Sequence, residues 1–216
     1  MDVEANPRVL EELKHFGVDR VPALIIGDGS FQGWNPRQLA AFVGVEYRNS
    51  ESLSLPALTE LLDKILAAAQ GVMEQVPDKH IGMKSPGRDR TVRDLGFHLF
   101  RLSLAYRDAI EEAPFSEECF LEKAPVEMVN GEAVARYGQM VRQHLKEYFT
   151  LLMGYDGDIS TNYGHQTAHE LLERTVWHAA QHLRQLYVFL EWMGKIPIDP
   201  LTDAEFKGLP LPEEIW

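Results

Sequence analysis

Cysteine is almost missing from this sequence: Cys119 is the single one among 216 residues. One cysteine cannot form an internal disulfide, and it excludes zinc sites built from several cysteines as well as Cys-x-x-Cys redox pairs. Basic residues are scarce too, because 21 Lys and Arg stand against 33 Asp and Glu, a net charge of −12. This balance argues against a protein that binds DNA, RNA or an anionic membrane through bulk charge.

Long hydrophobic runs are also missing. No apolar stretch approaches the ~20 residues that a membrane-spanning helix needs, and residues 1–4 lack the basic and apolar regions of a secretory signal peptide. We therefore expect a cytoplasmic protein without a membrane partner. Hydrophobic residues make up 45% of the chain and charged residues 25%, the ordinary mixture of a folded protein. The acidic stretches at 111–127 and 199–216 are expected to be solvated surface.

The first 45 residues have the pattern of a small α/β segment. Two short helices are indicated by a proline in the first turn of each and a glycine directly after its last turn. Two strands are indicated by apolar runs next to a turn that contains glycine. In order, we expect a helix opened by Asn6-Pro7 and ended by Gly17, a strand at 21–26, a turn at 27–30, a strand at 31–34, and a helix from Asn35-Pro36 to Gly44.

The rest of the chain has the pattern of four long amphipathic helices. Apolar residues recur at steps of three and four, so each helix has one face to bury. The helices are expected to begin at Ser54, Thr91, Asn130-Gly131 and the capping box 167–170, and the third to stop at Gly154. The pattern predicts a mainly α protein with a four-helix bundle at 55–200, a linker at 46–54 and an acidic tail at 201–216.

Two of the eight histidines fall inside a helix face that should be apolar. His178 and His182 lie in the core-facing stripe of the fourth helix, so their rings project from one face about one turn apart. A buried imidazole needs a partner, because an unsatisfied buried polar group costs about 1–3 kcal/mol. A divalent metal ion shared by both rings is one solution, and a chance pair of helical histidines is the alternative.

A third ligand is available on another helix. His98 borders the apolar stripe of the second helix, three residues after Leu95 and four before Leu102. Three neutral nitrogens from two facing helices would form one face of a coordination shell and leave its other positions open to water or substrate. Three imidazoles suit Zn, Ni, Fe or Co. Structural roles are expected for the other histidines: His15, His80, His144, His165 and His169.

These histidines lie in segments that resemble a known family. Residues 178–186, His-Ala-Ala-Gln-His-Leu-Arg-Gln-Leu, are similar to the last core helix of the DinB-like superfamily, and residues 91–99 are similar to its second helix. The resemblance covers roughly residues 55–195. Two positions depart from the family pattern: Gln181 stands where His is commoner, and Leu183-Arg184 stands where Arg-Gly is commoner. Neither departure changes a ligand position. The resemblance implies an up-down-down-up bundle, often dimeric, with a divalent metal ion on His98, His178 and His182.

The branches that this chain looks like include thiol S-transferases and isomerases that use mycothiol, bacillithiol or glutathione. The resemblance therefore implies a metal-dependent transferase or isomerase, or a related hydrolase, acting on a small-molecule electrophile with a low-molecular-weight thiol as cosubstrate. Zn or Ni is expected before Fe or Co. The alternative is a non-catalytic, stress-associated bundle that binds a metal ion or another ligand. Asp94 and Gln185 are outer-shell candidates, with helix capping as the alternative role of Asp94.

The first segment resembles the second half of a glutaredoxin or thioredoxin-fold domain. Residues 20–26 are similar to the strand that begins with the family's cis-proline, and residues 32–34 to the turn after its partner strand. The resemblance implies thiol-binding positions at Val21, Pro22 and Gly33. The family's active-site cysteine would lie before Met1, so a partial or degenerate module without redox chemistry is expected. Cys119 is expected to be a half-buried small residue rather than a nucleophile.

Overall fold

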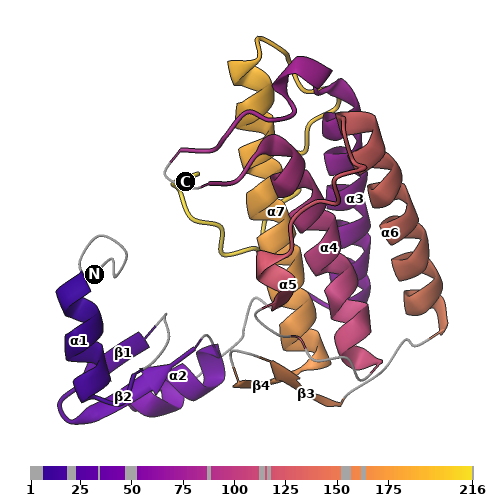
Figure 1. Ribbon diagram of the computed structural model, residues 1–216. Coiled ribbons are helices and arrows are strands. Elements are labelled where there is room, and N and C mark those ends of the chain that lie inside the picture. The colour runs from indigo at the N-terminus through magenta and orange to yellow at the C-terminus, as the bar shows by residue number, and fades with distance from the viewer. Residues whose placement is uncertain are drawn as a thin grey trace. The chain divides into compact units, whose positions relative to one another are not determined.

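The computed structural model is mainly helical, with two small antiparallel sheets of two strands each (Figure 1). It describes residues 7–18, 23–33, 35–46, 53–86, 89–111, 115, 118–151, 157–161 and 164–215. By their internal contacts the residues form two compact units, 1–50 with 160–166 and 51–159 with 167–216. The division at residue 50 falls inside the segment 46–54, where the composition predicts a linker.

The first unit contains two short helices and a hairpin, in the predicted order. These are α1 (Pro7–His15), β1 (Ala23–Ile26), β2 (Gly29–Gln32) and α2 (Pro36–Val43). The predicted turn at 27–30 is too long, because Ile26 pairs directly with Gly29 and the turn is Gly27-Asp28 alone. Gly27 has a φ of 57°, which a two-residue hairpin turn requires and glycine adopts at little cost.

Asn35 fixes the start of α2, as predicted. Its side chain accepts a hydrogen bond from the backbone N–H of Gln38, and Gly44 ends the helix in the left-handed conformation. The Asn35 Nδ2 group also donates to the carbonyl of His165, 2.7 Å away, in strand β4 (Gly164–Thr167). Residues far apart in the sequence are thus joined within the first unit.

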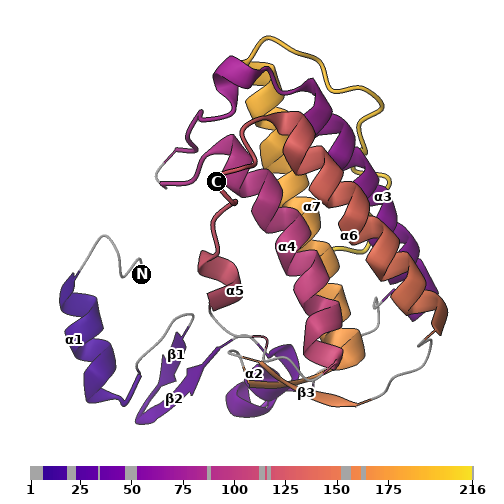
Figure 2. The ribbon, with the colours of Figure 1, turned by 45° about the vertical axis from the view of Figure 1, so that its right-hand side comes forward.

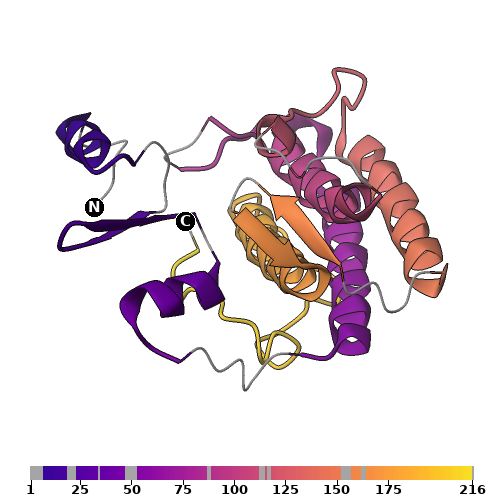
Figure 3. The same ribbon diagram turned by 90° about the horizontal axis from the view of Figure 1, so that it is seen from below.

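Four long helices make up most of the second unit: α3 (Leu55–Gln75), α4 (Val92–Ile110), α6 (Gly131–Leu151) and α7 (Ala168–Trp192). α3 and α4 each pack against both α6 and α7, and their buried apolar residues belong to one core. Figure 3 shows these helices side by side, seen from below. The chain runs in one direction along α3 and α7 and in the opposite direction along α4 and α6 (Figures 1 and 2). Residues 111–130 carry it back from the end of α4 to the start of α6.

The predicted starts of all four helices are confirmed. Ser54 and Thr91 each accept a hydrogen bond from a backbone N–H three residues further on, and Asn130 does the same at α6. Thr167 and Glu170 form the reciprocal capping box of α7. These side chains satisfy amide groups that the first turn of a helix leaves without an intrahelical partner. The predicted stop at Gly154 lies outside the described residues.

Four short features are not predicted by the sequence. They are the 3₁₀ turn η1 (Asp78–His80), helix α5 (Glu118–Leu121), strand β3 (Asp158–Thr161) and strand β4, which pairs with β3. Each is too short for a hydrophobic period to show. The expectation that residues 111–127 are solvated surface is wrong at Phe115 and Ala124, which are each only 5% exposed. The chain therefore buries apolar side chains even where its composition is acidic.

None of the helices in the described part of the chain combines the length and the apolar character needed to cross a membrane. The apolar faces of α3, α4, α6 and α7 point into the shared core of the second unit. The largest fully buried side chains there include Phe100, Phe189, Leu58, Ile65, Met73, Leu99, Leu172 and Leu183.

The approach of α4 to α6 depends on a glycine. A Cβ atom at Gly138 of α6 would lie 2.4 Å from the ring of Phe100 of α4, and that ring is fully buried. Because close-packed interiors have little room for an extra methyl group, the ring or the helix would have to shift. Gly71 of α3 is a natural comparison, since a Cβ there meets nothing within 4 Å.

Gly138→Ala is expected to lower the free energy of unfolding by about 1–3 kcal/mol through overpacking. Gly71→Ala, the matched control in a neighbouring helix, is expected to raise it by about 0.5–1 kcal/mol through helix propensity alone. Urea unfolding followed by circular dichroism measures both changes. Shifts of the same sign and size in the two variants would contradict the packing of Phe100 on Gly138.

Candidate metal centre

The three predicted ligands lie together between two helices. His98 comes from α4, and His178 and His182 come from successive turns of α7. The ring centroids lie 5.2 Å apart for His98 and His178, 5.1 Å for His98 and His182, and 4.2 Å for His178 and His182. One nitrogen of each ring lies within 4.8 Å of the corresponding nitrogens of the other two.

The donor set and its spacing fit a divalent ion. Two imidazole nitrogens that share one ion at ~2.1 Å are at most ~4.2 Å apart. On one tetrahedral ion such nitrogens are ~3.4 Å apart, so nitrogens that lie within 4.8 Å of one another would need to move closer by about 1 Å to share the ion. Three neutral nitrogens suit zinc and the other first-row divalent metals better than magnesium or calcium, which prefer oxygen ligands.

The surroundings keep the imidazoles out of water. His98 and His182 are 3% and 7% exposed, and His178 is half-buried. Burial lowers the pKa of His178 well below 6.5, and nearby positive charges, first His182 and His98 and then Arg174 and Arg90, lower it further. A lowered pKa keeps the ring neutral near pH 7, and the neutral ring is the form that binds a metal ion.

One aromatic ring that the sequence does not predict lies against the histidines. The Phe120 ring of α5 lies 6.4 Å from the His98 ring and 6.3 Å from the His178 ring. Phe115 packs edge-on against Phe120, with ring centroids 5.5 Å apart. Both phenylalanines stand in the acidic stretch 111–127, where the apolar residues among six glutamates show no helical period.

Gln185, which the sequence predicts as an outer-shell candidate, contacts a candidate ligand. Its Oε1 atom lies 2.7 Å from Nδ1 of His182, and its Nε2 atom donates to the carbonyl of Ile215 over 2.8 Å. Hydrogen bonds to the second ring nitrogen orient a metal-binding histidine. Gln185 thus lies where an outer-shell residue is needed.

The contacts of Asp94 are those of a capping acid. Its Oδ2 atom accepts a hydrogen bond from the Thr91 hydroxyl over 2.7 Å, and its Oδ1 atom accepts one from the backbone N–H of Ala124 over 3.3 Å. Arg93 lies 3.6 Å from the same carboxylate. These contacts favour the structural alternative for Asp94, because they tie the start of α4 to the segment that follows α5.

The other predicted site residues lie elsewhere or outside the described residues. Val21 and Pro22 are not described. Gly33 is buried in the first unit and has a φ of 92°, a backbone conformation that favours glycine. Cys119 of α5 is half-buried, as expected. His169 faces away from the pair on α7, since its Nε2 atom lies 2.9 Å from the carbonyl oxygen of Leu53.

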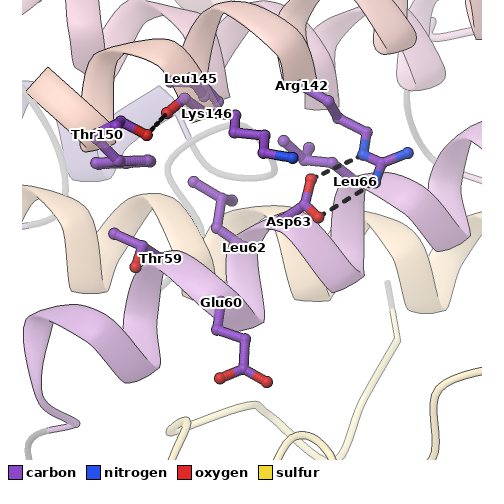
Figure 4. Close-up of a pocket in the computed structure, with 10 residues that line it drawn as sticks. Thr59, Glu60, Leu62, Asp63, Leu66, Arg142, Leu145, Lys146 and Thr150 are labelled. Atoms are coloured by element: carbon purple, nitrogen blue, oxygen red, sulfur yellow. Dashed lines mark hydrogen bonds and ion pairs between the residues drawn. The ribbon is translucent and has the colours of Figure 1, made fainter.

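A separate groove lies between α3 and α6 (Figure 4). Apolar side chains such as Leu62 and Leu66 line it, and Asp63 accepts two hydrogen bonds from Arg142 over 2.8 and 3.1 Å. Figure 4 shows this bidentate ion pair joining the two helices, with Lys146 beside it. The described residues that line the groove include none of the three clustered histidines, so it is not part of the candidate metal centre.

Neither the models of protein families nor the curated proteins contain a match to this chain. Its function is therefore inferred from its residues and from the resemblance of the two histidine-bearing segments.

Proposed function

We propose that the second unit is a DinB-like four-helix bundle that binds one divalent metal ion through His98, His178 and His182. The convergence of these three side chains from α4 and α7 is the observation that carries the proposal. The directions of the four helices, up-down-down-up along the chain (Figure 1), support the same family. An open three-histidine set leaves coordination positions for a small ligand.

The described residues have distinct roles in this proposal. The three imidazoles hold the ion, Gln185 orients His182, and the Phe120 ring shields the histidines from water. A bound divalent ion supplies Lewis acidity, which lowers the pKa of a coordinated thiol or water so that the nucleophile forms near neutral pH. The resemblance favours Zn or Ni over Fe or Co, although three imidazoles suit all four ions.

We further propose that the reaction is thiol-dependent, an S-transfer or an isomerisation with a low-molecular-weight thiol. The positive charges of Arg174 and Arg90, which lower the pKa of His178, favour an anionic ligand such as a thiolate at the same place. Arg174 is one helical turn before His178 on α7, on the same side of the helix. The glutaredoxin-like first segment supports a thiol-linked role by association.

Metal content tests the first proposal. Protein purified without chelator is expected to hold about one divalent ion per chain, and His178→Ala/His182→Ala is expected to hold almost none, because one imidazole cannot retain the ion. His169→Ala is the matched control, since its ring belongs to the same helix but faces Leu53. Elemental analysis after gel filtration measures all three. Equal metal content in the wild type and the double variant would refute the proposal.

A thiol assay tests the second proposal. Mycothiol, bacillithiol and glutathione are each mixed with 1-chloro-2,4-dinitrobenzene, in which the thiolate sulfur bonds to the ring carbon and chloride leaves with its electron pair. The metal-loaded protein is expected to accelerate the reaction with at least one thiol at least tenfold over the metal-free protein, because the ion favours the thiolate. If none of the thiols reacts faster with the metal-loaded protein than with the metal-free protein, the chain is a metal-binding bundle without this activity.

A further inference from the structure

The end of the chain lies along α7, on a row of hydrogen-bond donors. Gln181, Arg184 and Gln185 follow Trp177 by four, seven and eight residues, so all four share one side of the helix. Opposite them is the C-terminal strap, which we define as residues 210–215. The sequence predicts an acidic solvated tail here, and residues 210 and 212–214 are indeed exposed, but residues 210–215 still belong to the same compact unit as α7.

The strap binds through its backbone carbonyls. The indole N–H of Trp177 donates to Pro210 O over 2.9 Å, and Arg184 donates to Pro212 O over 2.7 Å and to Glu213 O over 3.4 Å. The amide of Gln181 donates to Glu214 O over 3.4 Å and to Ile215 O over 2.9 Å. Each donor is matched to an acceptor, so the register of the strap on α7 is fixed.

The last contact of the strap reaches the candidate metal centre. Gln185 donates from Nε2 to Ile215 O over 2.8 Å, and its Oε1 atom lies 2.7 Å from Nδ1 of His182. A backbone carbonyl can only accept, so the –NH₂ group of the amide must face Ile215 and the amide oxygen must face His182. An amide oxygen can only accept as well. Nδ1 of His182 therefore carries the proton.

This chain of two hydrogen bonds determines which nitrogen of His182 can bind an ion. A neutral imidazole has one N–H and one lone pair, so protonation at Nδ1 places the lone pair on Nε2. Nε2 of His182 is buried. Without the Ile215 carbonyl, the Gln185 amide can rotate by half a turn and present its –NH₂ group to Nδ1 of His182. The other tautomer, with a proton on Nε2, would then be populated and could not bind the ion there.

We propose that the C-terminal strap contributes to metal binding: the Ile215 carbonyl orients Gln185, and Gln185 holds His182 in the tautomer that binds metal. Gln185 is thus a positioning residue, and the strap acts through it. The effect on metal affinity rests on the proposed three-histidine site, whereas the effect on the tautomer of His182 does not.

A strap-release variant tests this inference in the full-length chain. Gln181→Ala/Arg184→Ala removes four of the hydrogen bonds that hold residues 212–215, and alanine preserves the helical propensity of α7. Gln185→Leu removes the link to His182 itself. Tyr187→Phe is the matched control, because its hydroxyl accepts a hydrogen bond from Leu201, outside the strap. Circular dichroism verifies that each variant is folded.

The first readout is the tautomer of His182 in metal-free protein, from the ¹⁵N shifts of its ring nitrogens near pH 8. The wild type and Tyr187→Phe are expected to show the Nδ1–H form, and the strap-release variant a mixture of both tautomers. A single Nδ1–H tautomer in the strap-release variant would overturn the inference. Because this readout needs no metal, it decides the inference even if the wild type binds none, a result that would refute only the proposed function.

The second readout is the dissociation constant of Zn²⁺, from competition with a chromophoric chelator. Gln185→Leu is expected to weaken binding about 10–100-fold, as the loss of an outer-shell partner does, and strap release about three- to tenfold. Combining the two changes is expected to add nothing to Gln185→Leu alone, because the strap acts only through Gln185. Affinity losses that simply add, or an unchanged affinity after strap release, would contradict the inference.

Discussion

Three imidazole rings in the apolar interior between α4 and α7 are the constraint on which the second unit depends. A buried polar ring without a partner costs about 1–3 kcal/mol, so a fold that places three of them side by side must supply partners of suitable geometry. The pairwise ring separations of 4.2–5.2 Å are short enough for one ion to serve all three. Metal binding would thus give the imidazole nitrogens a partner and would create a reactive position in this part of the core.

The helices around this centre are placed by ordinary packing and capping. Caps at Ser54, Thr91 and Thr167 fix where α3, α4 and α7 begin, and the fixed starts set the angle at which each histidine faces its neighbours. The close contact of Gly138 with Phe100 brings α6 against α4. None of these features takes part in metal binding itself, but together they hold His98 close to His178 and His182 on α7.

Much of this arrangement can be read from the sequence, because helices have a fixed period. The phase of His178 and His182 in an apolar stripe, and the position of His98 beside Leu95, are local properties that need no tertiary information. His169 precedes His178 by nine residues, half a turn out of phase on a helix, and its ring contacts Leu53 rather than the pair. The predicted hairpin turn is two residues too long because Gly27-Asp28-Gly29-Ser30 contains several turn-forming residues, and only the pairing of Ile26 with Gly29 selects among them.

The remaining features depend on contacts between distant segments. Phe120 belongs to a short helix in an acidic stretch, and only the fold places its ring against His98 and His178. The strap is held by backbone carbonyls, which every residue has, so composition indicated only an acidic tail. The spacing of Gln185 from His182 is enough to predict it as an outer-shell candidate. Its second partner, the carbonyl of Ile215, cannot be predicted from the sequence.

The central claim is that the imidazoles of His98, His178 and His182 bind one ion together. X-ray absorption at the metal edge of the loaded protein counts its nitrogen ligands most directly. Our account predicts three imidazole nitrogens at ~2.0–2.1 Å from zinc, with the remaining coordination taken by water or added thiol. A spectrum with one imidazole or none, or with only oxygen ligands, would contradict it.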